Sequence, residues 1–480
     1  MNNIKKFICV LMLIAADITA LLVAFLVAYV IRSEALPHLA TLGQPALPLS
    51  TQLTSAFSLI ALILIIIFAF EKLYTKRFSF WDETRHLLKG ITLSFVLLMV
   101  IVFITRSYTQ FSRAVLVITC LLSLVTIPFF RLFIKKLLVK IDLWKKNVLI
   151  LGTDAAAKLI VQGLEKNPTL GYKVVGLLTD NKALIGNDIG NQNGVRVIGE
   201  ISELEKLSKV LDVQDIIIAI PSIGRQRLTN LVERCEKLTE TIRIIPDTGS
   251  LFTVGVETEN LGDILSLSVA RNLAKPWNIF VKRVFEFFSA LLFFACFSPF
   301  FLVISLAIKL NSPGPVFFFQ ERLGQKGKTF KIIKFRSMYA ESDAKLREYL
   351  SQNLEVQKEW EQYQKIKNND PRVTKVGKFL RKYSLDESPQ LLNVLKGEMS
   401  LVGPRPYLPR ERLKMGEALN IISRVKPALT GLWQVSGRNI LPFKERLIMD
   451  EYYIRNWSFW LDIVILLRTL RVIVKREGAY

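Results

Sequence analysis

Residues 285–308 read FEFFSALLFFACFSPFFLVISLAI, and the way this apolar run meets a membrane decides the fold of the chain around it. The run is longer than the roughly 20 residues that a helix needs to cross the hydrocarbon core of a bilayer. If it crossed, the segments before and after it would lie on opposite sides of the membrane. The sequence outside the run therefore has to indicate whether it crosses.

Three features argue against a simple crossing. Pro299 follows Ser298 within the run, where a proline removes a backbone hydrogen bond and bends a helix, and the serine hydroxyl can bond to a carbonyl of the preceding turn. Cations flank both ends, so neither end favours the outer side: Lys282, Arg283 and Lys309. Residues 309–480 also hold 32 Lys and Arg against 18 Asp and Glu, a charge that is costly to export. We therefore expect a kinked, re-entrant helix over residues 282–309 that enters one leaflet and returns, with an ordinary proline-kinked span as the alternative.

Four further apolar runs lie upstream, at about residues 7–31, 53–70, 90–105 and 114–134. Each is long enough, or nearly so, to cross the hydrocarbon core. Cations gather before the first run, between the second and third, and after the fourth. The positive-inside rule then predicts a four-helix transmembrane bundle over residues 1–146, with both ends in the cytoplasm. Asp17 lies inside the first run, where a polar side chain is expected to line a helix interface.

The composition fits a chain that is part membrane protein and part basic soluble domain. Hydrophobic residues make up 51% of the 480 residues, and 64 Lys and Arg against 41 Asp and Glu give a net charge of +23. Such a surplus suits anionic lipid, phosphorylated substrates or nucleic acid. The sequence contains no helix-turn-helix or RNA-binding signature, so no nucleic-acid partner is expected. With two histidines and four cysteines that form no CxxC, the chemistry must rest on carboxylates, Lys, Arg and the backbone.

Residues 147–250 have the pattern of a doubly wound α/β domain. NVLILG at 147–152 predicts a buried strand, and KVVGLLTD, VRVIGE, DIIIAIP and IRIIPD follow at α/β spacing. The first turn reads GTDAAAK, with Ala155 and Ala157 where glycines would let the backbone approach a pyrophosphate. Asp180 ends the second strand, where it could bind a ribose or simply form the turn. The pattern predicts a degenerate Rossmann-like domain with a structural or regulatory role, and a bound dinucleotide is the alternative.

Two other segments have less regular patterns. Residues 251–277 predict a linker with a small hairpin. SFWLDIVILLRTLRVIVKR at residues 458–476 predicts a helix with one apolar and one basic face. This helix lies in the membrane interface or packs on the core, and the pattern does not decide between these two interpretations.

After the apolar run, cations recur between turns. FKIIKFRSM alternates as a strand with Lys334 and Arg336 on one face. Further polar residues in turn-rich stretches are Arg372, Arg381, Arg405, Gln434 and Arg438. Cations and exposed backbone amides in such stretches suit phosphate or diphosphate groups, so these residues are candidate phosphate ligands.

Among these cations stand two adjacent carboxylates, Asp386 and Glu387. Ser388 is a good N-cap, Pro389 fits a first helical position and Gly397 would end the helix. The pair would then precede a helix N-terminus, which favours anions, and the nearby cations should keep both carboxylates ionised. One could attack phosphorus as a nucleophile while the other holds Mg²⁺. The alternative is an ordinary charge pair at the start of a helix.

The motifs from residue 282 onward resemble those of the bacterial sugar transferase family, the monotopic polyprenyl-phosphate phosphoglycosyl transferases. They are Lys282 with Arg283, Ser298 with Pro299, SPGPVFF, KFRSM, DPRVTKVGKFLRKYSLDESPQLLNVLKGEMSLVGPRP, TGLWQVSGRN and the terminal GAY. The resemblance covers residues 278–480, which it identifies as an α/β monotopic catalytic domain, and the upstream regions match the large members. Glu286 departs from the family pattern, which usually has Asp there.

The resemblance implies a two-step reaction. Asp386 would attack the β-phosphorus of a UDP-hexose and release UMP, and the phosphosugar would then pass to undecaprenyl phosphate. Glu387 matches the Mg²⁺-binding partner. Other residues that match family motifs are Arg381, Arg405, Arg438 and Asp450. The family implies a cytoplasmic catalytic domain at the bacterial inner membrane and the first membrane step of O-antigen, capsule or exopolysaccharide synthesis.

Several choices stay open. The motifs FSR, IPFFR and EGAY are most similar to those of members that transfer galactose 1-phosphate, and glucose 1-phosphate is the alternative. A membrane-bound, NAD-dependent nucleotide-sugar dehydratase or epimerase is a second enzyme class, which the GTDAAAK turn argues against. A non-enzymatic scaffold of polysaccharide assembly would need no carboxylate pair. The sequence does not decide the oligomeric state, for which a homodimer through the middle domain is one candidate.

Overall fold

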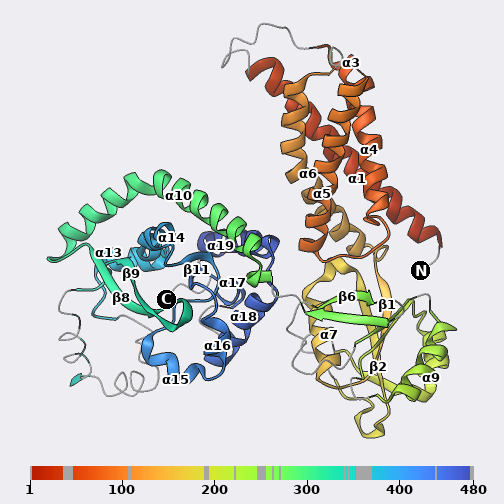
Figure 1. The fold of residues 1–480 in the computed structure, drawn as a ribbon. Coiled ribbons are helices and arrows are strands. Elements are labelled where there is room, and N and C mark those ends of the chain that lie inside the picture. The colour runs from red at the N-terminus through yellow and green to blue at the C-terminus, as the bar shows by residue number, and fades with distance from the viewer. Residues whose placement is uncertain are drawn as a thin grey trace. The chain divides into compact units, whose positions relative to one another are not determined.

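The computed structural model describes residues 3–35, 47–105, 111–188, 194–220, 223–239, 241–245, 256–261, 264–269, 272–339, 342, 346, 349, 351–352, 370–437 and 441–475. The chain divides into two compact units, Met1–Gly249 and Ser250–Tyr480, which we call unit 1 and unit 2. Unit 1 contains long helices followed by a parallel sheet, and unit 2 contains the segment with the carboxylate pair (Figure 1).

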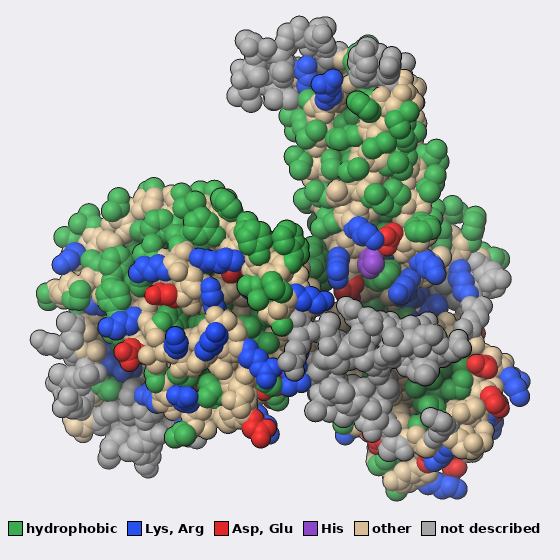
Figure 2. Space-filling view, in the orientation of Figure 1, with side chains coloured by type: hydrophobic (Ala, Val, Ile, Leu, Met, Phe, Trp, Pro, Cys, Tyr) green, Lys and Arg blue, Asp and Glu red, His purple; other side chains and the backbone are tan. Residues whose placement is uncertain are grey.

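Unit 1 begins with long apolar helices: α1 (Asn3–Val30), α4 (Ser58–Phe70), α5 (Phe80–Ile104) and α6 (Arg113–Lys140). The π-helical turn η1 (Ile31–Ala35) extends α1, and α3 (Leu49–Gln52) and η2 (Leu53–Phe57) lead into α4. Each of the four stretches is long and apolar enough to cross a membrane. They are longer than the predicted apolar runs because polar residues continue the helices at their ends. Hydrophobic side chains cover their outer faces (Figure 2), as a surface in contact with lipid requires.

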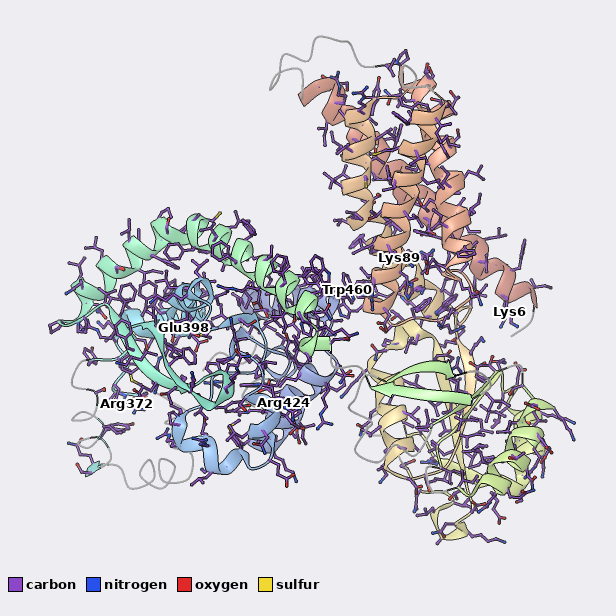
Figure 3. All side chains as sticks on the ribbon, viewed as in Figure 1. Lys6, Lys89, Arg372, Glu398, Arg424 and Trp460 are labelled. Atoms are coloured by element: carbon purple, nitrogen blue, oxygen red, sulfur yellow. The ribbon has the colours of Figure 1, made fainter. Side chains whose placement is uncertain are left out.

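Lys89 and Arg77 lie at the end of these helices that adjoins the sheet of unit 1. Lys89 pairs with Glu71 at 2.8 Å (Figure 3). Arg77 donates through Nη1 to the carbonyl of Gly171 at 2.7 Å, and its guanidinium lies 4.5 Å from a ring centroid of Trp144. Gly171 has φ +66° and leaves no room for a side chain, because a Cβ there would lie 2.5 Å from the backbone oxygen of Trp144. Arg77 therefore fastens the helices to the sheet.

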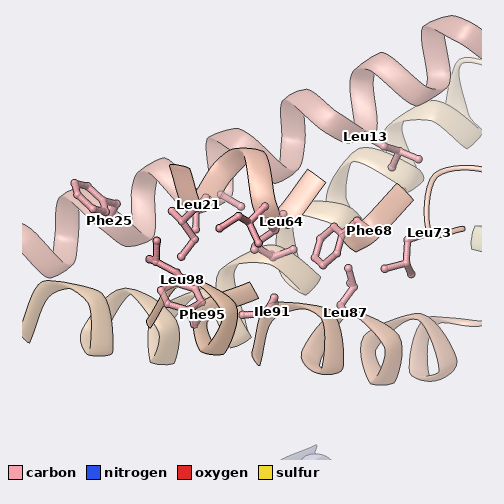
Figure 4. Close-up of a cluster of buried hydrophobic side chains, with 14 of the residues drawn as sticks. Leu13, Leu21, Phe25, Leu64, Phe68, Leu73, Leu87, Ile91, Phe95 and Leu98 are labelled. Atoms are coloured by element: carbon pink, nitrogen blue, oxygen red, sulfur yellow. The ribbon is translucent and has the colours of Figure 1, made fainter. Parts of the chain in front are cut away.

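One hydrophobic cluster joins the four long helices (Figure 4). Phe25 of α1, Leu64 of α4, Leu98 of α5 and Ile127 of α6 all belong to it, and none is more than 1% exposed. Lipid tails are as apolar as these side chains. Close packing, rather than removal from water, therefore holds such helices together in a membrane.

Four charged side chains lie between the same helices, and we call them the Arg131 cluster: Asp17, Glu83, Arg131 and Lys135. Arg131 donates to Asp17 at 2.6 Å and to Glu83 at 3.0 Å, and Lys135 bonds to the same Glu83 oxygen at 2.7 Å. The Tyr74 hydroxyl donates to Asp17 at 2.9 Å. No side chain of the cluster is more than 6% exposed. Asp17 therefore lines a helix interface, as its position in the first apolar run predicted.

The sheet of unit 1 has five parallel strands in the order β3-β2-β1-β4-β5. The strands are β1 (Lys146–Leu151), β2 (Tyr172–Thr179), β3 (Val197–Glu200), β4 (Asp215–Ile218) and β5 (Thr241–Ile244). The helices are α7 (Ala155–Lys166), α8 (Leu204–Val210) and α9 (Arg225–Glu236), with short turns η4 (Pro168–Leu170), η5 (Lys182–Leu184) and η6 (Ile201–Glu203). The strand order reverses between β1 and β4, which confirms the doubly wound parallel sheet.

Two residues that follow strands at the switch point of this sheet are Gly152 and Asp180. Gly152 after β1 has φ +114°, and a Cβ there would lie 2.3 Å from the carbonyl oxygen of Ala219. Asp180, the acid at the end of β2, forms an ion pair with Arg227 at 2.6 Å. A protein cation therefore already engages the carboxylate that would have to meet a ribose.

Unit 2 opens with an antiparallel hairpin of β6 (Val256–Leu261) and β7 (Ile264–Val269), which confirms the hairpin predicted within residues 251–277. The turn η8 (Asn272–Ala274) then leads into α10 (Pro276–Asn311), one helix that contains Pro299. The Ser298 hydroxyl donates to the carbonyl of Ala295 at 2.9 Å, the bond to the preceding turn that the sequence predicted. Figure 1 shows α10 arched over unit 2. Of its most apolar 18-residue stretch, only 6% is buried.

The rest of unit 2 is a mixed α/β fold. The antiparallel pair β8 (Phe317–Leu323) and β9 (Thr329–Phe335) flanks the turn η9 (Gln325–Gly327), and β10 (Ser400–Val402) pairs parallel with β11 (Ala428–Thr430). The helices are α13 (Lys375–Lys382), η10 (Leu385–Gln390), α14 (Leu391–Lys396), η11 (Pro409–Glu411), α15 (Arg412–Met415), α16 (Ala418–Ile422), α17 (Leu432–Ser436), α18 (Phe443–Arg455) and α19 (Phe459–Lys475). One core cluster includes Ala290 of α10 and buried residues of α14, α15, α16, α18 and α19. Leu380 of α13 belongs to a second, smaller cluster with Ile308 of α10 and Phe335 of β9.

The helix predicted over residues 458–476 is α19. Ile465 is fully buried and Val472 is 7% exposed, so one face packs on the core. Leu467 and Leu470 are 47% and 54% exposed, so a second apolar stripe faces outward. The core-facing interpretation therefore describes one side of α19, and the interfacial interpretation stays a prediction for the other.

Candidate active site

The carboxylate pair lies inside the short 3-10 helix η10. The predicted N-cap at Ser388 is wrong, because η10 already starts at Leu385 and the Ser388 hydroxyl donates to the Leu385 carbonyl at 2.7 Å. Ser384 precedes η10 with φ +54°, a left-handed conformation that turns the chain out of α13. Gly397, with φ +81°, ends α14 as predicted. Consecutive side chains of a 3-10 helix differ by about 120° in direction, so the two carboxylates face different surroundings.

Glu387 faces a pocket whose walls carry cations. The Nζ of Lys334 lies 2.6 Å from Oε1 of Glu387. Burial acts to raise the pKa of Glu387, but the attraction of Lys334 and Arg405 outweighs it, and the pKa lies below its usual value. Glu387 is therefore an anion within a cationic site. Other polar residues that line the pocket are Arg322, Gln390, Arg405 and Gln434.

Asp386 has the opposite electrostatic setting. Burial and the charge of Glu387 raise the pKa of Asp386 by more than Lys334 and Arg381 lower it. The sequence predicted that the cations would keep both carboxylates ionised. They hold the pKa of Glu387 below its usual value but not that of Asp386, because Asp386 is buried and is repelled by the charge of Glu387. Among the described residues, none forms an ion pair with Asp386. Asp386 adjoins Glu387 but does not itself line the pocket. A carboxylate without an ion pair can act as a nucleophile toward phosphorus.

Arg405 reaches the pocket from the segment that follows β10. Its guanidinium lies 5.6 Å from a ring centroid of Trp433, and the guanidinium of Arg446 lies 5.0 Å from the same residue's ring. Gly431 at the start of the TGLWQ turn is required by a close approach, because a Cβ there would lie 2.3 Å from the Gly403 carbonyl oxygen. The two loops that carry Arg405 and Gln434 are therefore packed directly against each other.

Asp450 is fully buried behind this segment and does not line the pocket. The Tyr407 hydroxyl donates to its Oδ2 at 2.8 Å. The Arg405 backbone N–H and the Trp433 indole N–H face the same carboxyl without reaching hydrogen-bond geometry at Oδ1. Burial, only partly offset by these donors, raises the pKa of Asp450 to about 8. Asp450 therefore supports the Arg405 segment as a neutral acid near pH 7, and a direct contact with substrate stays a prediction.

The other predicted ligands are placed unequally. Lys334, Arg405 and Gln434 meet at the pocket. Arg381 lies near Asp386 and donates to the Ser337 hydroxyl at 2.9 Å. Arg336 is 6% exposed and donates to the carbonyls of Ser312 and Pro313, so it fixes the end of α10. Arg372, labelled in Figure 3, pairs with Asp370 at 2.6 Å. Arg438 lies outside the described residues.

Arg322 is a pocket residue that the sequence analysis did not identify. It donates to the Pro406 carbonyl at 3.1 Å and to Gln320 at 2.6 Å, and burial together with repulsion by Arg405 lowers its pKa to about 10. The signal was present in the alternation of FFFQERL. In the β8–β9 pairing Phe318 lies opposite Lys334, so Arg322, four residues further on, shares the face of Lys334.

The donor set at Glu387 fits Mg²⁺. Lys334 engages Oε1, and among the described residues Oε2 has no hydrogen-bond partner. Mg²⁺ is usually held by one or two carboxylates together with substrate phosphates, rather than by a full protein cage. The described residues contain no cluster of three or more His, Cys, Asp or Glu that would form such a cage. Glu387, with Asp386 beside it, is therefore the group that could share a magnesium ion with a phosphorylated substrate.

Comparison with known proteins agrees with this geometry. The family model described as bacterial sugar transferase matches residues 277–476, which contain η10, the pocket and α10. An undecaprenyl-phosphate galactose phosphotransferase from Salmonella typhimurium is 34% identical over 412 residues, covering 85% of this chain and 84% of that protein. The chain belongs to the bacterial sugar transferase family.

Other relatives cover the same regions. A UDP-galactose-lipid carrier transferase from Erwinia amylovora is 34% identical and covers 85% of this chain and 84% of its own length. A UDP-glucose:undecaprenyl-phosphate glucose-1-phosphate transferase from Escherichia coli is 33% identical and covers 70% of this chain and 69% of its own length. A second model, described as a CoA-binding domain, matches residues 73–246 in unit 1. The resemblance seen in the motifs is thus confirmed, and it extends beyond the catalytic segment into unit 1.

Proposed function

We propose that this chain transfers hexose 1-phosphate from a UDP-sugar to undecaprenyl phosphate and releases UMP. The observation that carries the proposal is the pocket itself: Lys334, Arg322 and Arg405 surround Glu387, while the adjacent Asp386 is left without an ion pair among the described residues. Cations suit a diphosphate, and an unpaired carboxylate suits a nucleophile. Galactose 1-phosphate is the first candidate because relatives covering most of the chain are named for galactose.

In the first step an oxygen of Asp386 forms a bond to the β-phosphorus of the UDP-sugar. The bond from that phosphorus to the bridging oxygen breaks, and UMP leaves with the electron pair. In the second step a phosphate oxygen of undecaprenyl phosphate attacks the same phosphorus, and the bond to Asp386 breaks. The product is a lipid diphosphate sugar, and Asp386 is restored as a carboxylate.

The remaining residues bind and orient. Lys334, Arg322 and Arg405 stabilise negative charge on the phosphoryl oxygens, which is the main requirement of phosphoryl transfer. Glu387 would hold Mg²⁺, which supplies further charge neutralisation on the diphosphate when bound. Because the pKa of Asp386 is raised, the nucleophile has to be deprotonated before it can react, and acid should inhibit the first step.

For the membrane we propose that the four long helices of unit 1 span the bacterial inner membrane and that α10 is re-entrant. In this arrangement α10 stays in one leaflet and unit 2 stays on the cytoplasmic side. The exposed apolar surface of α10 and its internal proline support this proposal. One substrate is soluble and the other is a lipid, so the site has to lie at the membrane surface.

A UMP-release assay tests the proposal. Purified protein with undecaprenyl phosphate and Mg²⁺ should release UMP from UDP-galactose faster than from UDP-glucose. Asp386→Asn, tested in the same detergent, should release none. Faster turnover of UDP-glucose would assign the sugar as glucose, the second candidate that the Escherichia coli relative favours. UMP release by Asp386→Asn at the wild-type rate would end the proposed mechanism.

A further inference from the structure

The first turns of α10 make polar contacts that the reaction just described does not use. Lys282 and Arg283 are adjacent, and Glu286 lies one helical turn after Lys282. Lys282 and Glu286 are only 9% and 4% exposed. Buried charges are costly unless their hydrogen bonds are satisfied, so their partners indicate what they hold in place. We call these three residues the α10 clamp.

Two residues of the α10 clamp hold the short strand β10. Glu286 accepts hydrogen bonds from the Ser400 hydroxyl and, at 3.1 Å, from the Leu401 backbone N–H. Lys282 donates to the carbonyl of Val402 at 3.0 Å. Ser400, Leu401 and Val402 are the whole of β10, so each of its residues is bonded to a clamp side chain.

Lys282 is itself fixed from several sides. Its Nζ lies 2.6 Å from Asp462 of α19, 2.9 Å from Glu286 and 3.1 Å from the Tyr453 hydroxyl of α18. Trp457 donates to the same Asp462 oxygen at 3.0 Å. The Lys282 ammonium group is therefore held in place. If it moved, the carboxylates of Glu286 and Asp462 and the carbonyl of Val402 would lose the cation that they share.

Arg283 holds a second segment. It donates through Nη1 to the carbonyl of Val394 at 2.6 Å and through Nη2 to that of Leu395 at 2.8 Å. These carbonyls belong to the last turn of α14, where the regular helical hydrogen bonds end. The Val394 carbonyl also accepts from the Gly397 N–H at 3.0 Å. α14 follows η10 without a break, and η10 carries Asp386.

The two segments held by the α10 clamp thus lead to the nucleophile, Asp386, and to a cation proposed to bind phosphate, Arg405. β10 runs directly into the segment with Arg405, and α14 continues the helix that carries Asp386. We infer that Lys282, Arg283 and Glu286 are positioning residues that set the separation between the nucleophile and the Arg405 guanidinium. This inference rests on the proposed function. If α10 is the helix that enters the lipid, its position in the membrane is coupled to the geometry of the catalytic site through these three residues.

The test is a single-turnover measurement of UMP release from UDP-galactose without acceptor. Its amplitude reports the fraction of competent protein, and its rate constant reports the geometry of the site. Lys282→Met should keep a measurable amplitude but lower the rate constant about 10- to 100-fold, because displacements of about 1 Å have effects of this size. A lower amplitude with a wild-type rate constant would show a merely structural role and overturn the inference.

Lys309→Met is the matched control. It removes the same charge from the same helix. The Lys309 side chain makes no hydrogen bond to the described part of the chain, so the rate constant should stay at the wild-type value. Arg283→Met removes the two hydrogen bonds to the carbonyls of α14, so it serves if Lys282→Met does not fold. Its rate constant should fall while its amplitude stays, and an unchanged rate constant would count against the α10 clamp.

A double variant identifies the route of the effect. If Lys282 acts through Arg405, then Lys282→Met should slow an Arg405→Ala protein by a smaller factor than it slows the wild type, because coupled residues are not additive. Equal factors in both backgrounds would contradict positioning through Arg405. Absence of any Asp386-dependent UMP release from the wild type would instead reject the proposed function, so the two failures are distinguishable.

Discussion

Unit 1 and unit 2 each contain two carboxylates surrounded by cations, yet the two groups are built differently. In the Arg131 cluster two acids pair with two cations and every member is buried: Asp17, Glu83, Arg131 and Lys135. At the pocket of unit 2, Glu387 lies among Arg322, Lys334 and Arg405. Asp386 beside it is subject to the positive charges of Lys334 and Arg381. A balanced, closed cluster stabilises a fold, whereas an unbalanced cluster next to a pocket has charge left for a ligand.

The largest expected effect is the loss of transfer activity when Asp386 of unit 2 is replaced. Asp386→Asn removes the nucleophile but keeps the size of the side chain, so transfer should fall by at least about 10³-fold. UMP release from UDP-galactose is the measurement, and thermal unfolding is the control for folding. Asp17→Asn, the matched change in unit 1, should leave the rate per competent molecule unaltered. A comparable loss of rate in Asp17→Asn would remove the distinction between the two clusters.

The next effect concerns stability and belongs to unit 1. Arg131→Met leaves Asp17 and Glu83 buried with one cation instead of two. Breaking a buried ion pair in this way costs about 3–5 kcal/mol. The variant should unfold at lower temperature in detergent, and the single-turnover amplitude should fall while the rate constant stays. Lys89→Met, which removes an exposed partner of Glu71, is the control and should change stability by less than about 1 kcal/mol. Arg131→Met with wild-type stability would show that the Arg131 cluster is not structural.

The sequence predicted the architecture better than the site. Apolar runs and α/β spacing indicated the helices, the parallel sheet and α10, because periodicity reports burial directly. It misplaced the helix start at Ser388, because a favourable capping residue inside the segment was outweighed by the left-handed turn at Ser384. It missed Arg322, because only the pairing of β8 with β9 places that residue beside Lys334. It grouped Arg336 with the ligands, although Arg336 follows the last residue of β9 and bonds to the carbonyls of Ser312 and Pro313. It also could not indicate that Glu286 bonds to β10, a contact between residues far apart in the chain.

A smaller effect concerns the pH dependence of the first step. The negative charge of Glu387 raises the pKa of Asp386, and the positive charge of Lys334 lowers it. Because the ionised form of Asp386 reacts, the rate should fall on the acid side as that carboxylate becomes protonated. Glu387→Gln should move this acid limb to lower pH, and Lys334→Met should move it to higher pH, besides slowing the reaction about 10²-fold. The measurement is the single-turnover rate constant against pH, and shifts in the same direction would contradict the assignment.

A further prediction concerns the pH dependence of stability and tests Asp450. Its folded pKa of about 8 lies above the ordinary value near 4, so the folded protein binds the extra proton more tightly. The associated stability is fully present below about pH 4, declines as the pH rises and is gone above about pH 8. Asp450→Asn resembles the protonated acid and lacks this decline. The melting temperature of the wild type should therefore fall relative to that of the variant between pH 5 and pH 9, and parallel curves would show that Asp450 is ionised when folded.

The central claim is that the unpaired carboxylate of unit 2 becomes covalently bonded to phosphorus. Intact-protein and peptide mass spectrometry after mixing the purified protein with UDP-galactose and Mg²⁺, without acceptor, measures this most directly. We expect an added mass of one hexose phosphate, located on Asp386, absent from Asp386→Asn and discharged by undecaprenyl phosphate. Steady release of UMP with no adduct, or an adduct on another residue, would contradict it.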